Sequence, residues 1–171
     1  NRQRSYLDIG ATFERFDESA AFKEDIEQRK FKIHLHQDNR DNPIYPGNGN
    51  VFVLKIDAYG GPLGGNRTYT KYDIDLRQYL SPIKDVTIAG RISVGTILGW
   101  KDEYDSNEKI LYEKFYLGGS NSLRAWKPLR FLEDGNYLPV GKEAKVLTNW
   151  ELRFPLFWKL GAVIFYDGGF I

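Results

Sequence analysis

Apolar and polar residues alternate along seven separate segments of this chain, and this period of two constrains the fold more than any other feature. The segments cover residues 5–14, 30–38, 51–59, 69–79, 86–98, 144–154 and 160–169. Successive side chains of a β-strand point to opposite faces of its sheet, so each segment is expected to form a strand with one apolar face. The sequence therefore predicts an all-β, antiparallel fold of about seven strands.

The strand charges collect on one face. In the segment 51–59, Phe52 and Leu54 share one face, whereas Lys55 and Asp57 share the other. If the apolar faces met lipid, a charge there would cost roughly 2–4 kcal/mol at mid-depth. Ten residues of tilted strand also rise about 25 Å, the height of the apolar band of an outer-membrane barrel. This favours a transmembrane β-barrel, but a soluble antiparallel barrel or sandwich would show the same alternation with its apolar faces inward.

The connections between the segments alternate in length. Short connections are expected at 39–50, 81–85 and 155–159, long polar ones at 15–29 and 99–143, and one of middle size at 60–68. Outer-membrane barrels have long loops outside the cell and short turns on the other side, so 99–143 is predicted to be an extracellular loop. Aromatic residues near the short connections are expected to form an interfacial girdle: Tyr45, Tyr79, Phe157 and Trp158.

Composition excludes several other classes of protein. The 171 residues are enough for one domain, and the chain has no Cys, which rules out disulfides and thiolate metal sites. Lys and Arg number 24 against 23 Asp and Glu, so there is no basic surplus to indicate nucleic-acid binding. The chain also lacks an apolar run of about 18 residues, as a transmembrane helix would need.

The long loop contains an arginine that could pair with two carboxylates on later strands. Arg124 lies within residues 115–126, and Glu151 and Asp167 lie in the last two strand segments. A planar guanidinium binds carboxylates in a fork geometry that Lys cannot reproduce. We therefore expect the loop to fold back into the barrel and lock there, with Phe165, on the same face as Asp167, packed beside the arginine.

Four motifs in this order resemble the barrel of the BamA/TamA-type outer-membrane assembly proteins, the bacterial surface-antigen superfamily. They lie at 38–47, 115–126, 149–155 and 165–169. The second resembles the family's sixth extracellular loop with its Val-Arg-Gly-Phe/Tyr motif, and its motif residues around Arg124 are Gly118, Gly119, Leu123, Ala125 and Trp126. Ala125 departs from the family's Gly, which puts in doubt any close backbone approach that a Gly would allow.

The resemblance implies that residues 1–171 are part of a transmembrane barrel of about sixteen strands, roughly the seventh to the thirteenth. The remaining strands and the POTRA domains that the family usually carries upstream would lie outside this chain. The implied function is the insertion of β-barrel proteins into the bacterial outer membrane, without enzymatic chemistry or a cofactor. The implied partners are outer-membrane lipids, unfolded outer-membrane protein substrates and accessory periplasmic or lipoprotein subunits, and not nucleic acid.

Other functions are considered as alternatives. The same barrel could serve as a translocation pore of the two-partner secretion type or as the anchor of a patatin-type lipase, and a soluble barrel could bind an apolar ligand. His34, His36 and Asp38 share a strand face, but a spacing of about 7 Å is long for a shared ion, so a polar lining is expected and no metal site. Ser120 and Ser122 have no nearby His in the sequence to activate them, and no catalytic residue is predicted.

Overall fold

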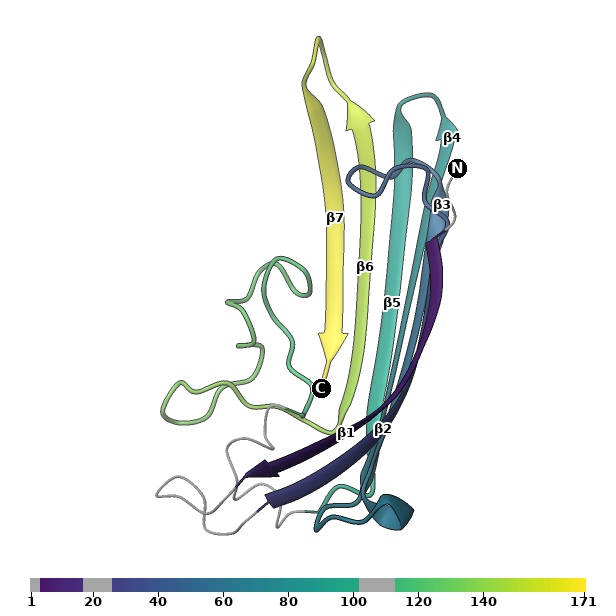
Figure 1. The fold of residues 1–171 in the computed structure, drawn as a ribbon. Coiled ribbons are helices and arrows are strands. Elements are labelled where there is room, and N and C mark those ends of the chain that lie inside the picture. The colour runs from purple at the N-terminus through teal and green to yellow at the C-terminus, as the bar shows by residue number, and fades with distance from the viewer. Residues whose placement is uncertain (1–3, 17–25, 102–112) are drawn as a thin grey trace.

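Seven antiparallel strands form one open sheet whose spatial order follows the chain (Figure 1). The computed structural model describes residues 4–16, 26–101 and 113–171. The strands are β1 (Arg4–Phe16), β2 (Ile26–Asp38), β3 (Gly49–Tyr59), β4 (Tyr69–Ile83), β5 (Val86–Leu98), β6 (Ala144–Pro155) and β7 (Gly161–Phe170), and a short 3-10 helix, η1 (Gly61–Leu63), precedes β4. The all-β antiparallel fold predicted from the alternation is confirmed.

The register shows that the two faces were assigned correctly. One row of cross-strand partners is apolar on all seven strands: Leu7, Leu35, Leu54, Ile74, Val94, Val146 and Phe170. The next row lies on the opposite face, and all of its members except one glycine are polar: Asp8, His34, Lys55, Asp73, Gly95 and Lys145. Since a slip by one residue would exchange the faces, the hydrophobic pattern itself fixes this register.

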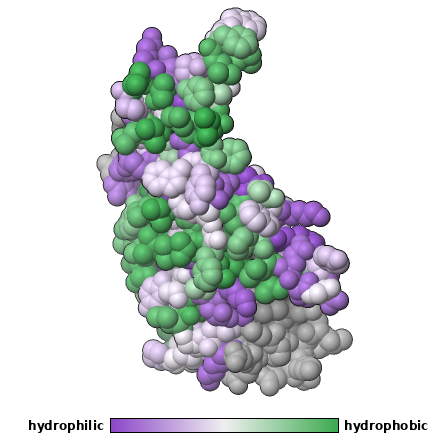
Figure 2. All heavy atoms as spheres, turned by 180° about the vertical axis from the view of Figure 1, so that it is seen from behind, coloured by the Kyte–Doolittle hydropathy of each residue, from purple (hydrophilic) through white to green (hydrophobic). Residues whose placement is uncertain are grey.

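The apolar face is exposed to its surroundings. Ile9 is 58% exposed, Ile92 46% and Trp150 48%, and Figure 2 shows apolar side chains gathered over the strands. A soluble barrel would bury these residues in a core, so that alternative is wrong. An apolar surface of this extent is what a lipid-facing wall requires.

Three expected connections are shorter than the sequence indicated, and one of them is 39–50, since β3 already begins at Gly49. β4 continues to Ile83 through a register shift between Leu80 and Ile83, so the turn 81–85 shrinks to Lys84 and Asp85. Pro82 lies in this shift, where a residue without an N–H is tolerated because the ladder is already interrupted. β1 and β2 also extend into the connection 15–29, whose residues 17–25 lie outside the described part.

Two of the four expected girdle aromatics are placed differently. The rings of Tyr45 and Tyr79 lie 5.2 and 5.9 Å from the Arg153 guanidinium, on the polar face of the sheet. For Tyr79 the alternation already indicates this face, since it lies two residues beyond Arg77 on β4, and cation–π attraction to Arg153 adds to the packing of both rings. Phe157 and Trp158, at the β6–β7 turn, are 68% and 89% exposed.

The long loop folds against the polar face, and the buried apolar residues lie between them. Figure 1 shows residues 113–143 beside the lower parts of β6 and β7. One apolar cluster contains Leu117, Leu123 and Leu147, with Phe131 and Ile171 packed against it. A second contains Tyr59, Tyr69, Ile97 and Phe115, with Trp100. Across the described ranges, no helix is long and apolar enough to cross a membrane.

Candidate functional site

Arg124 reaches from the loop to two carboxylates on the sheet. Its Nη1 donates to Glu151 Oε1 at 2.6 Å and its Nη2 to Asp167 Oδ1 at 2.6 Å. Nε and the backbone N–H of the same residue both donate to Asp167 Oδ2, at 2.8 and 3.1 Å. Asp167 is thus held in a fork by the guanidinium, a geometry that adds directional specificity to the charge attraction.

Phe165 completes this group of residues, which we call the loop lock: Arg124, Glu151, Asp167 and Phe165. The guanidinium carbon lies 3.9 Å from the centre of the Phe165 ring. The side chains are partly withdrawn from solvent, with 26% of Arg124, 21% of Glu151 and 7% of Asp167 exposed. The hydrogen bond to Asp167 is the main reason that the pKa of Arg124 is raised above its usual value.

The loop reaches this position through a tightly closed segment. Gly118 and Gly119 adopt positive φ values of 114° and 95°, and the Gly119 N–H donates to the carbonyl oxygens of Trp126 and Leu123. A Cβ on Gly118 would lie 2.4 Å from the Lys127 carbonyl oxygen, so only glycine fits there. Leu123, which is 1% exposed, anchors the residue before Arg124.

Ala125 and Trp126 fit the loop without a glycine. Among the described non-glycine residues with positive φ are Asp85, Leu129, Tyr137 and Trp158, but not Ala125. The backbone at this position therefore does not require the glycine of the related motif. Trp126 packs edge-on against Phe131, with 5.2 Å between the ring centres.

Two further wall residues hold the loop and were missed by sequence reasoning. Asn149 Nδ2 donates to the Ser122 carbonyl oxygen at 2.7 Å and to Asp167 Oδ1 at 2.8 Å. Arg91 Nη1 donates to the Asn121 carbonyl oxygen at 2.6 Å. Asn149 precedes Glu151 by two residues, so its place on the same strand face was the available signal.

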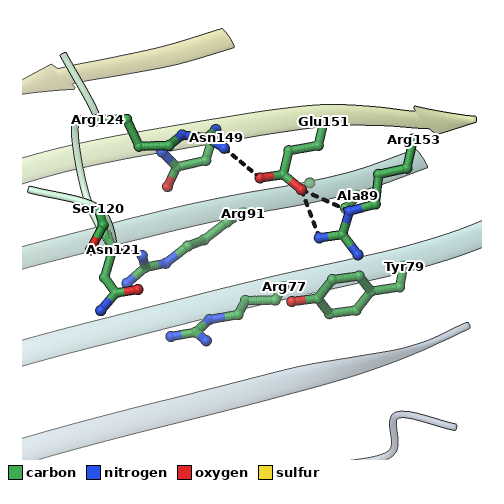
Figure 3. Close-up of a pocket in the computed structure, with 11 residues that line it drawn as sticks. Arg77, Tyr79, Ala89, Arg91, Ser120, Asn121, Arg124, Asn149, Glu151 and Arg153 are labelled. Atoms are coloured by element: carbon green, nitrogen blue, oxygen red, sulfur yellow. Dashed lines mark hydrogen bonds and ion pairs between the residues drawn. The ribbon is translucent and has the colours of Figure 1, made fainter. Parts of the chain in front are cut away.

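Glu151 also binds a second arginine (Figure 3). Its Oε2 accepts hydrogen bonds from Arg153 Nε at 2.8 Å and Nη2 at 2.6 Å, while Oε1 faces Arg124. The third nitrogen of Arg153 reaches the Pro46 carbonyl oxygen at 3.4 Å, in the turn between β2 and β3. One carboxylate therefore joins the loop to this turn.

The other residues considered from sequence have ordinary partners. His34 Nε2 lies 2.9 Å from Asp57 Oδ1, and the His36 ring stacks on Tyr6. Within the described ranges, there is no group of three residues suited to hold a metal ion. The Ser122 hydroxyl accepts a hydrogen bond from the Gly118 N–H.

The lock lies deep within the wall. Glu151 is seven residues beyond Ala144, where β6 begins, and at 3.3 Å per residue this is roughly 23 Å along the strand. The loop thus reaches more than half-way along β6 on the polar face. The arrangement pairs the donors of Arg124 with the carboxylates of Glu151 and Asp167. Such a set of contacts can hold the loop in place.

Comparisons with known proteins agree with this architecture. The model of the Omp85 superfamily domain matches residues 2–171. The outer membrane protein assembly factor BamA of Nitratidesulfovibrio vulgaris (strain Hildenborough) is 26% identical over 141 residues, covering 80% of this chain but only 17% of that protein. The crystal structure of BamA from Haemophilus ducreyi lacking POTRA domains 1–3 aligns with a TM-score of 0.64 at 17% identity, covering 85% of this chain and 30% of that one.

These matches establish the family and the location. The seven-stranded sheet corresponds to part of a larger barrel, and its exposed apolar face fits the bacterial outer membrane. Members of the family take part in outer-membrane protein assembly. The chain belongs to the Omp85 superfamily, as an incomplete segment of an outer-membrane β-barrel.

Proposed function

We propose that this chain is part of a longer, non-enzymatic protein that inserts unfolded β-barrel proteins into the bacterial outer membrane. Family membership and the similarity to an assembly factor support this function. In this proposal POTRA domains and the remaining strands lie elsewhere in the protein. Accessory periplasmic or lipoprotein subunits act with it, and outer-membrane lipids surround it.

The observation that carries the proposal is the docking of the loop on the inner wall through Arg124. Asp167 and Glu151 together accept four hydrogen bonds from this residue. Each hydrogen bond to a charged group contributes roughly 1.5–3 kcal/mol, and the sum is smaller because the side chains remain partly exposed. We propose that the docked loop keeps the barrel wall in the shape that accepts a substrate strand, so the lock acts by position alone.

Replacing Arg124 with Ala in the full-length protein tests this role. We expect the rate of substrate barrel insertion into liposomes to fall several-fold, because the loop loses its deepest attachment, and residues 113–131 should become accessible to protease. Arg130→Ala is the matched control, since Arg130 makes its contacts within the same loop, with Glu133 at 3.3 Å and the Tyr137 carbonyl oxygen at 2.7 Å.

If the Arg124→Ala variant inserted substrates at the wild-type rate and its loop stayed protected from protease, the result would contradict the role of the loop lock. The function itself fails if the intact wild-type protein inserts no β-barrel substrate. Transport of a soluble polypeptide by such a protein would assign it to the translocation pores instead.

A further inference from the structure

A cavity of about 440 Å³ lies beside the loop lock on the polar face (Figure 3). Four arginines line it, Arg77 from β4, Arg91 from β5, Arg124 from the loop and Arg153 from β6. Its floor is Ala89, which stands between Tyr79 and Glu151 in one cross-strand row. The small Ala89 side chain leaves the space open between larger polar neighbours.

The ion pairs around the cavity leave positive charge in excess. Asp75 is shared by Arg77 and Arg91, and Glu151 is shared by Arg124 and Arg153. Asp167 is the third carboxylate of this network. Four guanidinium groups therefore meet three carboxylates, which favours the entry of an anion.

Arg77 and Arg91 are direct cross-strand partners. Like charges placed opposite each other destabilise a sheet, and here the single carboxylate of Asp75 pairs with both arginines. The Nε and Nη2 atoms of Arg77 donate hydrogen bonds to Asp75, whereas its Nη1 contacts no acceptor among the described residues. Its side chain is 35% exposed, so this nitrogen can still bind a ligand.

The remaining acid of the cavity would not repel an anion strongly. Glu151 has both oxygens occupied, Oε1 by Arg124 and Oε2 by Arg153. Neutral groups that can donate a hydrogen bond complete the lining: the Tyr79 hydroxyl, the Ser120 hydroxyl and the Asn121 amide. These groups come from both the wall and the loop.

We propose that this cavity binds a phosphate group, either as a free anion or as the headgroup of a phosphorylated lipid. Arginine forks suit phosphate oxygens, and donors on several sides suit a tetrahedral anion better than a flat carboxylate. The bound group neutralises the Arg77–Arg91 pair and bridges the loop to the wall. This site goes beyond the proposed insertion activity and does not depend on it.

Titration calorimetry on the full-length protein in an uncharged detergent tests the site, with inorganic phosphate and glycerol 1-phosphate as probes. We expect saturable binding to the wild type and roughly ten-fold weaker binding to Arg77→Gln, which removes a charged donor. Ala89→Leu, which fills the cavity and leaves every charge in place, abolishes binding. Lys55→Gln is the charge-matched control on the same face, outside the cavity, and binds as the wild type does.

Heat-dependent mobility on gels verifies that each variant is folded, and Arg77→Gln remains informative if Ala89→Leu does not fold. Tighter binding of glycerol 1-phosphate than of inorganic phosphate identifies a lipid headgroup as the source, and the reverse identifies a free anion. Absence of saturable binding to the wild type overturns the proposal. Equal binding by the wild type and Arg77→Gln also overturns it, because the phosphate then lies elsewhere.

Discussion

At the scale of single residues, Asp41 shows how one carboxylate organises the turn between β2 and β3. Its Oδ1 accepts hydrogen bonds from the N–H groups of Asn42 and Gly47, and its Oδ2 from that of Asn48. The hydrogen bond from Asn48 is the largest influence, and it holds the pKa of Asp41 below its usual value of 3.8. The charged form is therefore the one that stabilises this turn.

The turn should accordingly lose stability in acid. Because the folded pKa of Asp41 is below the unfolded one, its contribution is complete above the unfolded pKa and disappears as pH falls through the folded value. We expect the protection factors of the Gly47 and Asn48 amides, which compare the measured exchange rate with the intrinsic rate at each pH, to fall below about pH 4 in the wild type. Asp41→Asn should exchange faster at neutral pH and show little of this acid dependence; an unchanged profile would disprove the role.

Sequence reasoning at this scale found residues within motifs and missed contacts between distant segments. The order of the motifs brought Arg124, Glu151 and Asp167 to attention, and the structure places them in contact. Arg153 and Pro46 lie 107 positions apart, and no local pattern indicates their contact. Which polar residues share a row depends on register, and strand periodicity fixes only the face of each residue.

At the scale of elements, periodicity predicted the strands well because each has one apolar face. All seven existed where alternation placed them, and β5 had the predicted bounds. The predicted end of β4, at residue 79, was wrong because the strand continues to Ile83 through a register shift, which interrupts the regular alternation. The folding of the loop on itself could not be predicted, since its sequence shows neither the period of two of a strand nor the period of 3.6 of a helix.

The junction of β5 with the loop depends on a glycine. A Cβ on Gly95 would lie 2.5 Å from Cζ of Phe115, whose ring also contacts the ammonium groups of Lys71 and Lys145, each at 4.9 Å. We expect Gly95→Ala to displace this ring and destabilise loop docking by about 1–3 kcal/mol, measured as faster hydrogen exchange at the Phe115 amide.

Gly135→Ala is the control for this substitution, because a Cβ there would meet nothing within 4 Å. If both alanine variants exchange equally slowly at Phe115, the close packing of Gly95 does not determine loop docking.

At the scale of the whole molecule, the segment is a wall with two different surroundings. Apolar side chains cover the outer face, whereas ion pairs such as Lys32–Asp8 and Lys145–Asp73 line the inner one. β1 and β7 each pair with one neighbour in this sheet, and lipid does not tolerate unpaired strand edges. These two edges therefore need pairing partners in the membrane.

A charge on the outer face should be far more harmful than one on the inner face. Ile92→Arg places a cation at the lipid-facing centre of β5 and should destabilise the full-length barrel by roughly 2–4 kcal/mol in denaturant unfolding from lipid vesicles. Val53→Arg on the inner face is the matched control, since Val53 lies opposite Asp75. Equal losses for the two variants would rule out the assigned orientation.

Glu151 has a consequence for how the long loop and the turn between β2 and β3 influence each other. Its two oxygens are divided between Arg124, which belongs to the long loop, and Arg153, which reaches the turn between β2 and β3 at Pro46. A displacement of either arginine alters the charge environment of the other through this single group. We therefore expect a displacement of the β2–β3 turn to weaken the attachment of the long loop, and release of the loop to loosen the turn.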